Sequence, residues 1–250
     1  MLILALDTTS EVGGVGIFRD AECLALVPNQ GLADRYSISL FEMVEQASKR
    51  ARLALSDIDL YAAANGPGSF TGIRVGLAAA RAWAKVFTRP VHGVSVMEAL
   101  VAKQGLEAGD WGLGGSAPDW YFPILDARRG EFFLGSFRRV TPDPPDARMA
   151  EYAAADDGWV LKPKELREFL HKRASGASAT CVVRAHDQAA VELCASLPPA
   201  VNSRHVQGVL VDAIAAIAAR EQHSGRPCPG AKLEAYYLRR PDAEIKLIGH

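Results

Sequence analysis

The chain of 250 residues has few cysteines, no long apolar run and no excess of basic charge. Its four cysteines form no Cys-x-x-Cys pair and lie near no paired histidines, so the sequence predicts neither a zinc site nor a redox motif, which fits a reduced cytosolic compartment. Because it lacks an uninterrupted run of ~18 apolar residues and a basic leader with a cleavage site, we expect a protein that is neither membrane-spanning nor secreted. The formal charge of −1 supplies no basic field for gripping nucleic acid unaided, so any RNA contact should be shared with a partner.

What the chain does have is a large apolar fraction, 49% of its residues, enough for the core of one large or two small domains. Apolar patterns in the first part predict three strands, then a helix, a strand, a helix, a strand and a helix. This order is that of a ribonuclease-H-like lobe, which we place at residues 1–104. The predicted elements are strands at Leu2–Leu6, Gly14–Phe18 and Cys23–Val27, a helix at about 35–55, a strand at Leu60–Ala64, a helix at Ile73–Phe87, a strand at Val91–Val94 and a helix from Ser95 to Lys103.

The second part is less regular. Residues 105–119 carry five glycines and a proline and are predicted to be a linker or a long surface loop. Residues 120–250 are predicted to form a second, smaller and more variable lobe with fewer strands. It opens with a hairpin whose turn carries Asp126, as the first hairpin carries Asp7, which indicates an old duplication. The later predicted elements are a helix at Pro163–Leu170, a strand at Thr180–Val183, and a helix at 205–221 that is expected to pack back on the first lobe.

The most distinctive motif is a glycine-rich loop at Asn65–Gly76, which follows a predicted strand and leads into a helix. It lacks the Gly-Lys-Ser/Thr of a Walker A sequence and the Gly-x-Gly-x-x-Gly of a dinucleotide site. Two interpretations remain open at this point. The glycines allow a tight loop with close helix packing, or the helix N-terminus binds an anion such as phosphate. Gly72, Gly76, Ala80 and Ala84 also form a stripe of small residues along the helix.

Together with Leu2–Ser10, Asp126–Glu131 and Tyr237–Arg239, this loop closely resembles the bacterial TsaB (YeaZ) family. The resemblance covers most of the chain and is weakest between about Thr141 and Val201. It implies an α/β fold of two ribonuclease-H-like lobes, as in the actin, sugar-kinase and chaperone ATPase superfamily (ASKHA). It also implies a partner subunit in making threonylcarbamoyladenosine on tRNA, next to the anticodon, a degenerate relative of the catalytic TsaD subunit with no enzymatic activity of its own.

In that superfamily, nucleotide phosphates lie between two hairpin turns, one in each lobe. The resemblance therefore assigns this chain vestigial phosphate loops, although the first turn could equally be held by side-chain oxygens on backbone N–H groups without any ligand. The second turn carries two arginines, which could bind an anion or a partner carboxylate or simply be solvated. The residues assigned to the loops are Asp7, Thr8, Thr9, Ser10, Gly66, Gly68, Ser69, Thr71, Gly72 and Asp126.

Other chemical signals are missing from the sequence. Catalytic TsaD relatives hold a metal through a His-x-x-x-His pair on the first helix, where this chain has 35–39 without histidine, and no other cluster has metal-ligand spacing. The segment 181–187 lacks the glycine turn that an adenosine site needs. Ser69 is not in a Gly-x-Ser-x-Gly motif, so its hydroxyl is expected to cap the loop or the helix. We therefore expect no catalytic residue and no metal site.

The first two helices of the first lobe carry more apolar residues than one buried face requires. We predict that they form a hydrophobic surface for the TsaD-like partner, with core packing inside the lobe as the alternative for each residue. The predicted interface residues are Leu40, Phe41, Met43, Val44, Ala47, Arg74, Leu77, Ala78 and Arg81.

The resemblance implies no firmly bound cofactor in this chain, with ATP and metal on the TsaD-like partner. It also implies a heterodimer with that partner, a TsaE-like ATPase in the larger complex, tRNA contact only through the complex, and a cytoplasmic location without a membrane. Two alternatives remain: a nucleotide-dependent kinase or hydrolase acting on its own through the phosphate loops, and a homodimer that uses the same apolar helix face.

Overall fold

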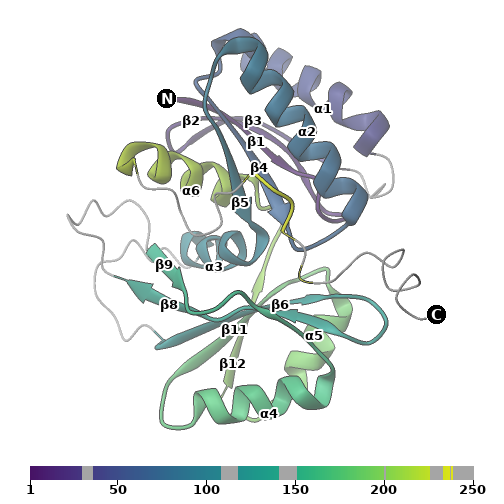
Figure 1. Ribbon diagram of the computed structural model, residues 1–250, viewed down its shortest axis with the longest axis vertical. Helices are drawn as coiled ribbons and strands as arrows, with labels where there is room; N and C mark the ends of the chain where they lie inside the picture. The colour runs from purple at the N-terminus through teal and green to yellow at the C-terminus, as the bar shows by residue number, and fades with distance from the viewer. Residues whose placement is uncertain are drawn as a thin grey trace.

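The computed structural model describes residues 1–29, 36–107, 118–140, 151–199, 201–225, 233–236 and 238. Two β-sheets are stacked with helices on their outer faces and two further helices between them (Figure 1). From one end to the other, the layers are a helix pair, a sheet, the two central helices, the second sheet and a second helix pair. Among these residues no helix combines the length and the apolar character needed to cross a bilayer.

The first sheet has five strands in the order β3-β2-β1-β4-β5, and the strand and helix order predicted for this lobe is confirmed. The first three strands are an antiparallel meander, and β4 and β5 run parallel to β1. All residues of β4 are buried, and so are all residues of β1 except the first, as their continuous apolar sequences predict. The strands are β1 (Leu2–Asp7), β2 (Gly14–Arg19), β3 (Glu22–Pro28), β4 (Leu60–Gly66) and β5 (Val91–Ser95).

Helices α1 (Tyr36–Ala51) and α2 (Phe70–Phe87) cover the outer face of this sheet. Helix α1 ends four residues before the predicted position, because Arg52 adopts a left-handed conformation with φ of 56° that stops the helix, and the short 3-10 helix η2 (Leu55–Asp57) follows. Helix α2 begins three residues before the predicted position, because the Ser69 hydroxyl accepts a hydrogen bond from the Gly72 amide at 3.2 Å and caps the first turn. The predicted capping role of Ser69 is thus confirmed.

The second sheet repeats the arrangement of the first. Its strands β10-β7-β6-β11-β12 show the same pattern of three antiparallel and then two parallel strands. Two further strands, β8 and β9, extend it from β6. The strands are β6 (Trp120–Asp126), β7 (Phe132–Leu134), β8 (Phe137–Val140), β9 (Glu151–Ala154), β10 (Trp159–Leu161), β11 (Ala179–Arg184) and β12 (Val201–Val206).

The prediction of fewer strands in the second lobe is wrong, because its sheet has seven strands against five in the first. Strands β7, β9 and β10 have only three or four residues, too few for a recognisable alternation of apolar and polar positions. The second strand of the hairpin, predicted at 131–137, is shorter: β7 covers Phe132–Leu134, and β8 begins only at Phe137. Part of the predicted linker, residues 108–117, and the proline-rich segment at 142–145 lie outside the described residues.

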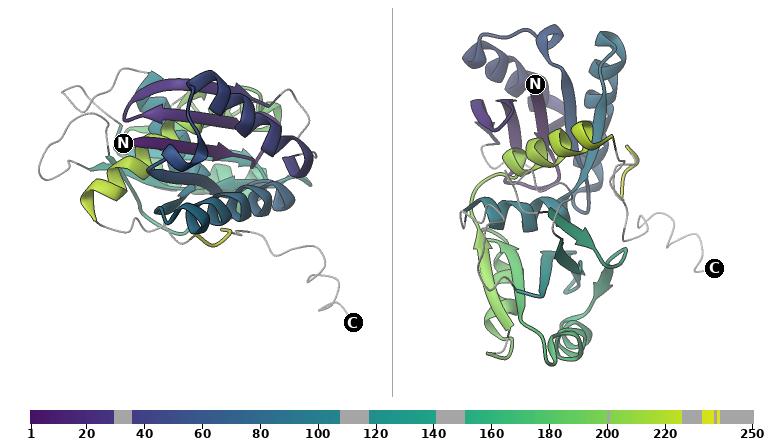
Figure 2. Two further views of the ribbon diagram at one scale, coloured as in Figure 1. Left: turned by 90° about the horizontal axis from the view of Figure 1, so that it is seen from above. Right: turned by 90° about the vertical axis from the view of Figure 1, so that its left-hand side faces the viewer.

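Each of the two central helices packs on the sheet of the lobe that it does not follow in the sequence. Helix α3 (Val96–Glu107) follows β5 of the first lobe but packs on β6, β11 and β12, whereas α6 (Val211–Ser224) follows β12 and packs on β1, β2 and β4 (Figure 2). The expected packing of the last helix on the first lobe is therefore found. The helices also contact each other, with Lys103 paired to Asp212 and Arg220 donating to Glu98 at 2.9 Å. The sheets consequently share one apolar cluster.

Two predicted boundaries near these helices are wrong. The last helix begins at Val211 and not at His205, because His205 pairs with Val183 in the second sheet. The first three residues of the predicted linker belong to α3, where Gly105 faces Tyr152 of β9: a β-carbon on Gly105 would lie 2.8 Å from the Tyr152 hydroxyl oxygen. The glycine thus serves close packing inside a helix. On the outer face of the second sheet lie α4 (Pro163–Ala174), which begins with the predicted proline, and α5 (Gln188–Ala195).

Candidate functional site

The first predicted phosphate loop is the turn between β1 and β2, and most of it is buried. Asp7, Thr8 and Thr9 are 0%, 1% and 3% exposed. The Asp7 Oδ1 atom accepts hydrogen bonds from the Thr9 amide at 3.0 Å and from the Thr9 hydroxyl at 2.6 Å. The carboxylate therefore stabilises its own turn, which was one of the two interpretations that the sequence left open.

The glycine-rich loop packs directly on this turn. The Ser69 amide donates to the Thr9 carbonyl oxygen at 2.7 Å, and the Thr8 hydroxyl donates to the Gly72 carbonyl oxygen at 2.6 Å. A β-carbon on Gly68 would lie 2.5 Å from the Thr9 carbonyl oxygen, and one on Gly72 would lie 1.9 Å from that of Thr8. The glycines thus allow close contact between two backbone segments, which favours the packing interpretation of this loop over phosphate binding. Thr71 is exposed on the first turn of α2.

The side chain of Arg184 lies against this turn from the opposite lobe. Arg184 is the last residue of β11 and only 2% exposed. Its Nη2 lies 3.1 Å from Asp7 Oδ2, and its Nη1 donates to the Ser10 hydroxyl oxygen at 2.6 Å and to the Val12 carbonyl oxygen at 3.1 Å. A cation of the second lobe therefore neutralises the buried carboxylate of the first.

The second predicted phosphate loop, between β6 and β7, has its own internal bonds. The Asp126 carboxylate accepts from the Arg128 amide at 2.7 Å, and the Asp126 amide donates to the Asp187 carboxylate at 2.8 Å. The Arg128 guanidinium extends across the lobes to 3.7 Å from the Glu11 carboxylate. The sequence left open whether these arginines bind an anion, bind a partner carboxylate or are solvated. Arg128 pairs with a carboxylate of its own chain, in an exposed position where an ion pair contributes little to stability.

The electrostatics around the turn follow from burial and from the Asp7–Arg184 pair. The Tyr36 hydroxyl donates to the Ser10 carbonyl oxygen at 3.1 Å, and burial together with the negative charge of Asp7 raises the Tyr36 pKa. Partial burial and then the positive charge of Arg184 lower the pKa of His186. Both shifts disfavour additional charge here.

The polar groups of this turn are engaged with one another and with Arg184: Asp7 Oδ1 accepts from the Thr9 hydroxyl, and the Ser10 hydroxyl oxygen accepts from Arg184. The glycine-rich loop packs against the same turn. No group of three or more His, Cys, Asp or Glu side chains that could hold a metal occurs among the described residues. The segment 181–187 forms the end of β11 and the cap of α5, where the Asp187 carboxylate accepts from the Ala190 amide at 3.1 Å.

The predicted partner interface divides into buried and exposed residues. Five of the nine predicted residues belong to the apolar core between the first sheet and its helices, and for them the alternative of core packing holds: Leu40, Met43, Val44, Ala47 and Leu77. The other four are exposed: Phe41, Arg74, Ala78 and Arg81.

The exposed part of α1 and α2 is what we call the helical face. The name covers the exposed side chains of Ile38 and Phe41 on α1 and of Phe70, Arg74, Ala78, Arg81 and Val86 on α2, and the same helices also expose charged residues such as Glu42, Glu45 and Lys85. Ile38, Phe41 and Val86 are 75%, 63% and 72% exposed, unusually high for side chains of this size. The rings of Phe41 and Trp83 pack in a T-shaped arrangement with their centroids 5.8 Å apart, and the Arg74 guanidinium lies 3.8 Å from the Phe70 ring centroid. The helical face thus combines exposed apolar side chains with two arginines.

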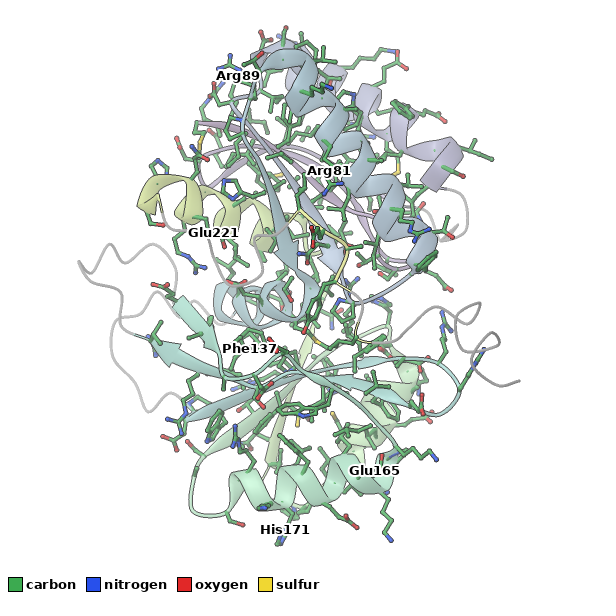
Figure 3. All side chains as sticks on the ribbon, in the orientation of Figure 1. Arg81, Arg89, Phe137, Glu165, His171 and Glu221 are labelled. Atoms are coloured by element: carbon green, nitrogen blue, oxygen red, sulfur yellow. The ribbon has the colours of Figure 1, made fainter. Side chains whose placement is uncertain are left out.

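A short C-terminal segment borders the helical face. Arg81 donates to the Leu233 carbonyl oxygen, so α2 and the segment lie side by side (Figure 3). The Tyr236 amide donates to the Asn65 carbonyl oxygen at 2.7 Å, next to Gly66, whose φ of 116° suits only glycine. Residues Leu233 and Ala235 pack on the core of the first lobe.

The sequence predicted neither the role of Arg184 nor that of this segment. The signal for Arg184 was an arginine at the end of an otherwise apolar strand, but its partner is 177 residues away along the chain. Residues 237 and 239 of the C-terminal motif lie outside the described residues, and the bond from Tyr236 to Asn65 depends on tertiary contacts that no local pattern indicates.

Comparisons with known proteins agree with this architecture. The sequence model of the family described as "TsaD: tRNA N6-adenosine threonylcarbamoyltransferase" matches residues 26–246. A Bacillus subtilis protein named "tRNA threonylcarbamoyladenosine biosynthesis protein TsaB" is 29% identical over 57% of this chain and 61% of its own length. The Escherichia coli protein of the same name is 30% identical over 69% of this chain and 66% of its own length. The matched regions thus span about three fifths to two thirds of these curated relatives.

Solved structures show the same fold. A Pseudomonas aeruginosa protein, described as "an uncharacterized protein with similarity to peptidase YEAZ", superimposes with a TM-score of 0.69 at 22% identity, over 95% of this chain and 99% of its own. A second structure, "YeaZ from Pseudomonas aeruginosa", gives a TM-score of 0.67 at 21% identity with the same coverage. The two-lobed α/β fold of this chain is therefore that of these YeaZ structures.

Proposed function

Because the chain belongs to the tRNA N6-adenosine threonylcarbamoyltransferase family, among its TsaB (YeaZ) members, we propose that it serves in forming threonylcarbamoyladenosine on tRNA. Its role would be that of a subunit that pairs with a TsaD-like transferase and performs no catalysis itself. The observation that carries this proposal is the helical face, where three large apolar side chains are exposed on adjacent helices.

The chemistry of the helical face fits a protein partner. Phe41 is anchored by its edge contact with Trp83, so the aromatic side chain is held in place before binding. Ile38 and Val86 extend the apolar area on α1 and α2, while Arg74 and Arg81 supply a positively charged margin. Apolar centres with charged rims are typical of specific protein interfaces.

The turn around Asp7 supports the non-catalytic part of the proposal. Its carboxylate bonds Thr9 and pairs with Arg184, so it is not free to bind a metal or to act as a base. The Ser69 hydroxyl caps α2 and is engaged with the Gly72 amide. We therefore place ATP and metal on the TsaD-like partner rather than on this chain.

The remaining partners follow from the same family membership. A TsaE-like ATPase would join the larger complex, and tRNA would be bound only by the assembled complex, since this chain carries a formal charge of −1. The location would be the cytoplasm, where tRNA is modified. When the partner is absent, the helical face could pair with a second copy of the chain, which would be a homodimer in competition with the heterodimer.

The proposal is tested by measuring mass and tRNA modification with purified components. We expect the chain and a TsaD-like subunit to co-purify as a complex, and threonylcarbamoyl transfer to tRNA to require both together with ATP. The chain alone should hydrolyse ATP no faster than background. If the chain alone hydrolysed ATP at about 1 per second or faster, and Asp7→Ala abolished this turnover, the alternative of an independent kinase or hydrolase would replace the proposal. Peptide hydrolysis by the chain alone would instead favour the peptidase activity mentioned for the Pseudomonas aeruginosa relative.

A further inference from the structure

Arg184 connects the two lobes at their centre. It belongs to β11, whose neighbours β6 and β12 are strands of the second sheet, but among the described residues the hydrogen-bond partners of its guanidinium lie at the end of β1 and in the β1–β2 turn of the first lobe. The guanidinium crosses the boundary between the lobes to contact the Asp7 carboxylate, the Ser10 hydroxyl and the Val12 carbonyl.

Because both side chains are buried, each charge depends on this contact for an oppositely charged partner. Asp7 is fully buried and Arg184 is 2% exposed, so neither charge is hydrated. A buried carboxylate without a cation is strongly unfavourable, and so is a buried guanidinium without acceptors. Moving the lobes apart would separate the pair and leave each charge in an apolar surrounding until water entered. The closed arrangement is therefore the one in which the two charges are paired, although the Arg184 Nε is buried without a hydrogen-bond partner among the described residues.

The pair bridges the β1–β2 turn of the first lobe and the end of β11 in the second. In a two-lobed fold, a molecule bound between the turns can hold the lobes together through charge. Here the positive charge comes from Arg184, and the glycine-rich loop fills the adjacent space through the Ser69–Thr9 and Thr8–Gly72 hydrogen bonds. Nothing further is needed to bring the turn and β11 together.

We propose that Arg184 is a positioning residue that replaces a bound ligand and holds the two lobes closed in the absence of nucleotide. The exposed Arg128–Glu11 pair between the same turns, at 3.7 Å, is solvated and adds little. Since α1 and α2 lie on the first lobe, the helical face keeps a fixed orientation relative to the second lobe. This inference concerns the chain alone and holds whether or not the proposed partner is the right one.

The experiment measures the distance between the lobes in the full chain. Spin labels are attached to Cys23, which is exposed on β3, and to a cysteine introduced by His171→Cys on the exposed side of α4. Cys228, which lies outside the described residues, is changed by Cys228→Ser, and Cys181 and Cys194 are buried. Double electron–electron resonance spectroscopy then gives the distribution of distances between the two labels. We expect one narrow distribution that saturating ATP with Mg²⁺ does not change.

Substitution of Arg184 should change this distribution. Arg184→Met keeps an unbranched apolar side chain, like the aliphatic part of arginine, but removes the charge, so the distribution should broaden toward longer distances. Arg184→Lys should restore part of the narrow population, because an ammonium can pair with Asp7 but cannot bond Ser10 and Val12 at the same time. Arg128→Met, the matched control in the exposed pair, should behave as the parent. A role of Arg184 confined to the fold of its own lobe would lower stability without moving the distance.

Three results would overturn the proposal. One is a folded Arg184→Met variant with the narrow distribution of the parent. Another, used if Arg184→Met does not fold, is an Arg184→Lys variant whose distribution is as narrow as that of the parent, since lysine cannot also bond Ser10 and Val12. The third is a parent distribution that shifts when ATP and Mg²⁺ are added, which would show that a ligand sets the closure, and this measurement does not depend on any variant.

Discussion

The Thr8 hydroxyl donates a 2.6 Å hydrogen bond to the carbonyl oxygen of Gly72, which joins the first turn of the chain to the first turn of α2. The bond is possible because Gly72 has no side chain: a β-carbon there would lie 1.9 Å from the Thr8 carbonyl oxygen. Four residues on, a β-carbon on Gly76 would lie 2.4 Å from the Thr8 hydroxyl oxygen. The stripe of small residues along α2 thus serves contact with the β1–β2 turn at its N-terminal end.

We predict that Gly72→Val and Gly76→Leu each destabilise the protein by at least ~1 to 3 kcal/mol, because the new side chain must displace backbone or Thr8 in a packed region. Thermal and urea unfolding measure the loss. Ala78→Val on the exposed side of the same helix is the matched control and should change stability by less than about 0.5 kcal/mol. Unfolding midpoints of the glycine variants equal to that of the parent would contradict the contact.

The helical face can be separated from the core by two aspartate substitutions on α1. Phe41→Asp alters a side chain that is 63% exposed, so the variant should fold with near-parent stability but fail to co-purify with a TsaD-like subunit. Met43→Asp alters a side chain that is 6% exposed, so it should unfold the protein or cost more than ~3 kcal/mol. The sequence assigned both residues to the partner interface, and the burial of Met43 shows that core packing, the alternative, holds for that residue.

Circular dichroism and co-purification are the measurements for this pair of variants. Glu45→Ala, at an exposed position of the same helix, is the control for a change of surface charge. A folded Phe41→Asp variant that still binds its partner and still supports tRNA modification would exclude Phe41 from the interface.

The buried pair should have a large effect on stability when only one charge is removed. Arg184→Met leaves the Asp7 carboxylate buried without its cation, and we expect a loss of ~3 to 5 kcal/mol. The double variant Asp7→Leu/Arg184→Met removes both charges and should recover much of this loss. Urea unfolding of the parent, both single variants and the double variant gives the coupling energy. Additive losses would show that the two side chains do not depend on each other.

The contact between α6 and the first sheet should be sensitive to pH through His92 of β5. The Glu221 carboxylate, 3.4 Å from His92 Nδ1, is the main cause that raises the His92 pKa, with Gln222 as a second hydrogen-bond partner. A raised pKa means that the folded state favours the protonated imidazole. This contribution to stability is complete below about pH 6.5, the ordinary histidine pKa, and is lost as the pH rises through the raised value.

We therefore expect the parent to lose stability relative to His92→Gln as the pH increases from about 6.5 upward, since glutamine does not titrate. Urea unfolding at a series of pH values measures the difference. The exposed His171→Gln on α4 serves as the control. Parallel stability curves for the parent and His92→Gln would mean that the pair with Glu221 does not form in solution.

Local sequence determined most of the first lobe. A buried strand or helix face must be apolar at every inward position, so local apolar patterns predict burial. This holds for the apolar runs of β1 and β4 and for the spacing of Leu40, Val44 and Ala47 on α1. The cap at Ser69 was also readable, since capping is a contact between residues three apart.

The tertiary structure decided what depends on distant partners. His205 belongs to a strand because Val183 lies beside it, and Met43 is buried while Phe41 is exposed because the sheet covers only one side of α1. The same holds for the centre of the molecule. The sequence identified Asp7 as a site residue, but the cation that neutralises it, Arg184, comes from the second lobe. The two residues are 177 positions apart, and no local pattern in either segment indicates that they pair.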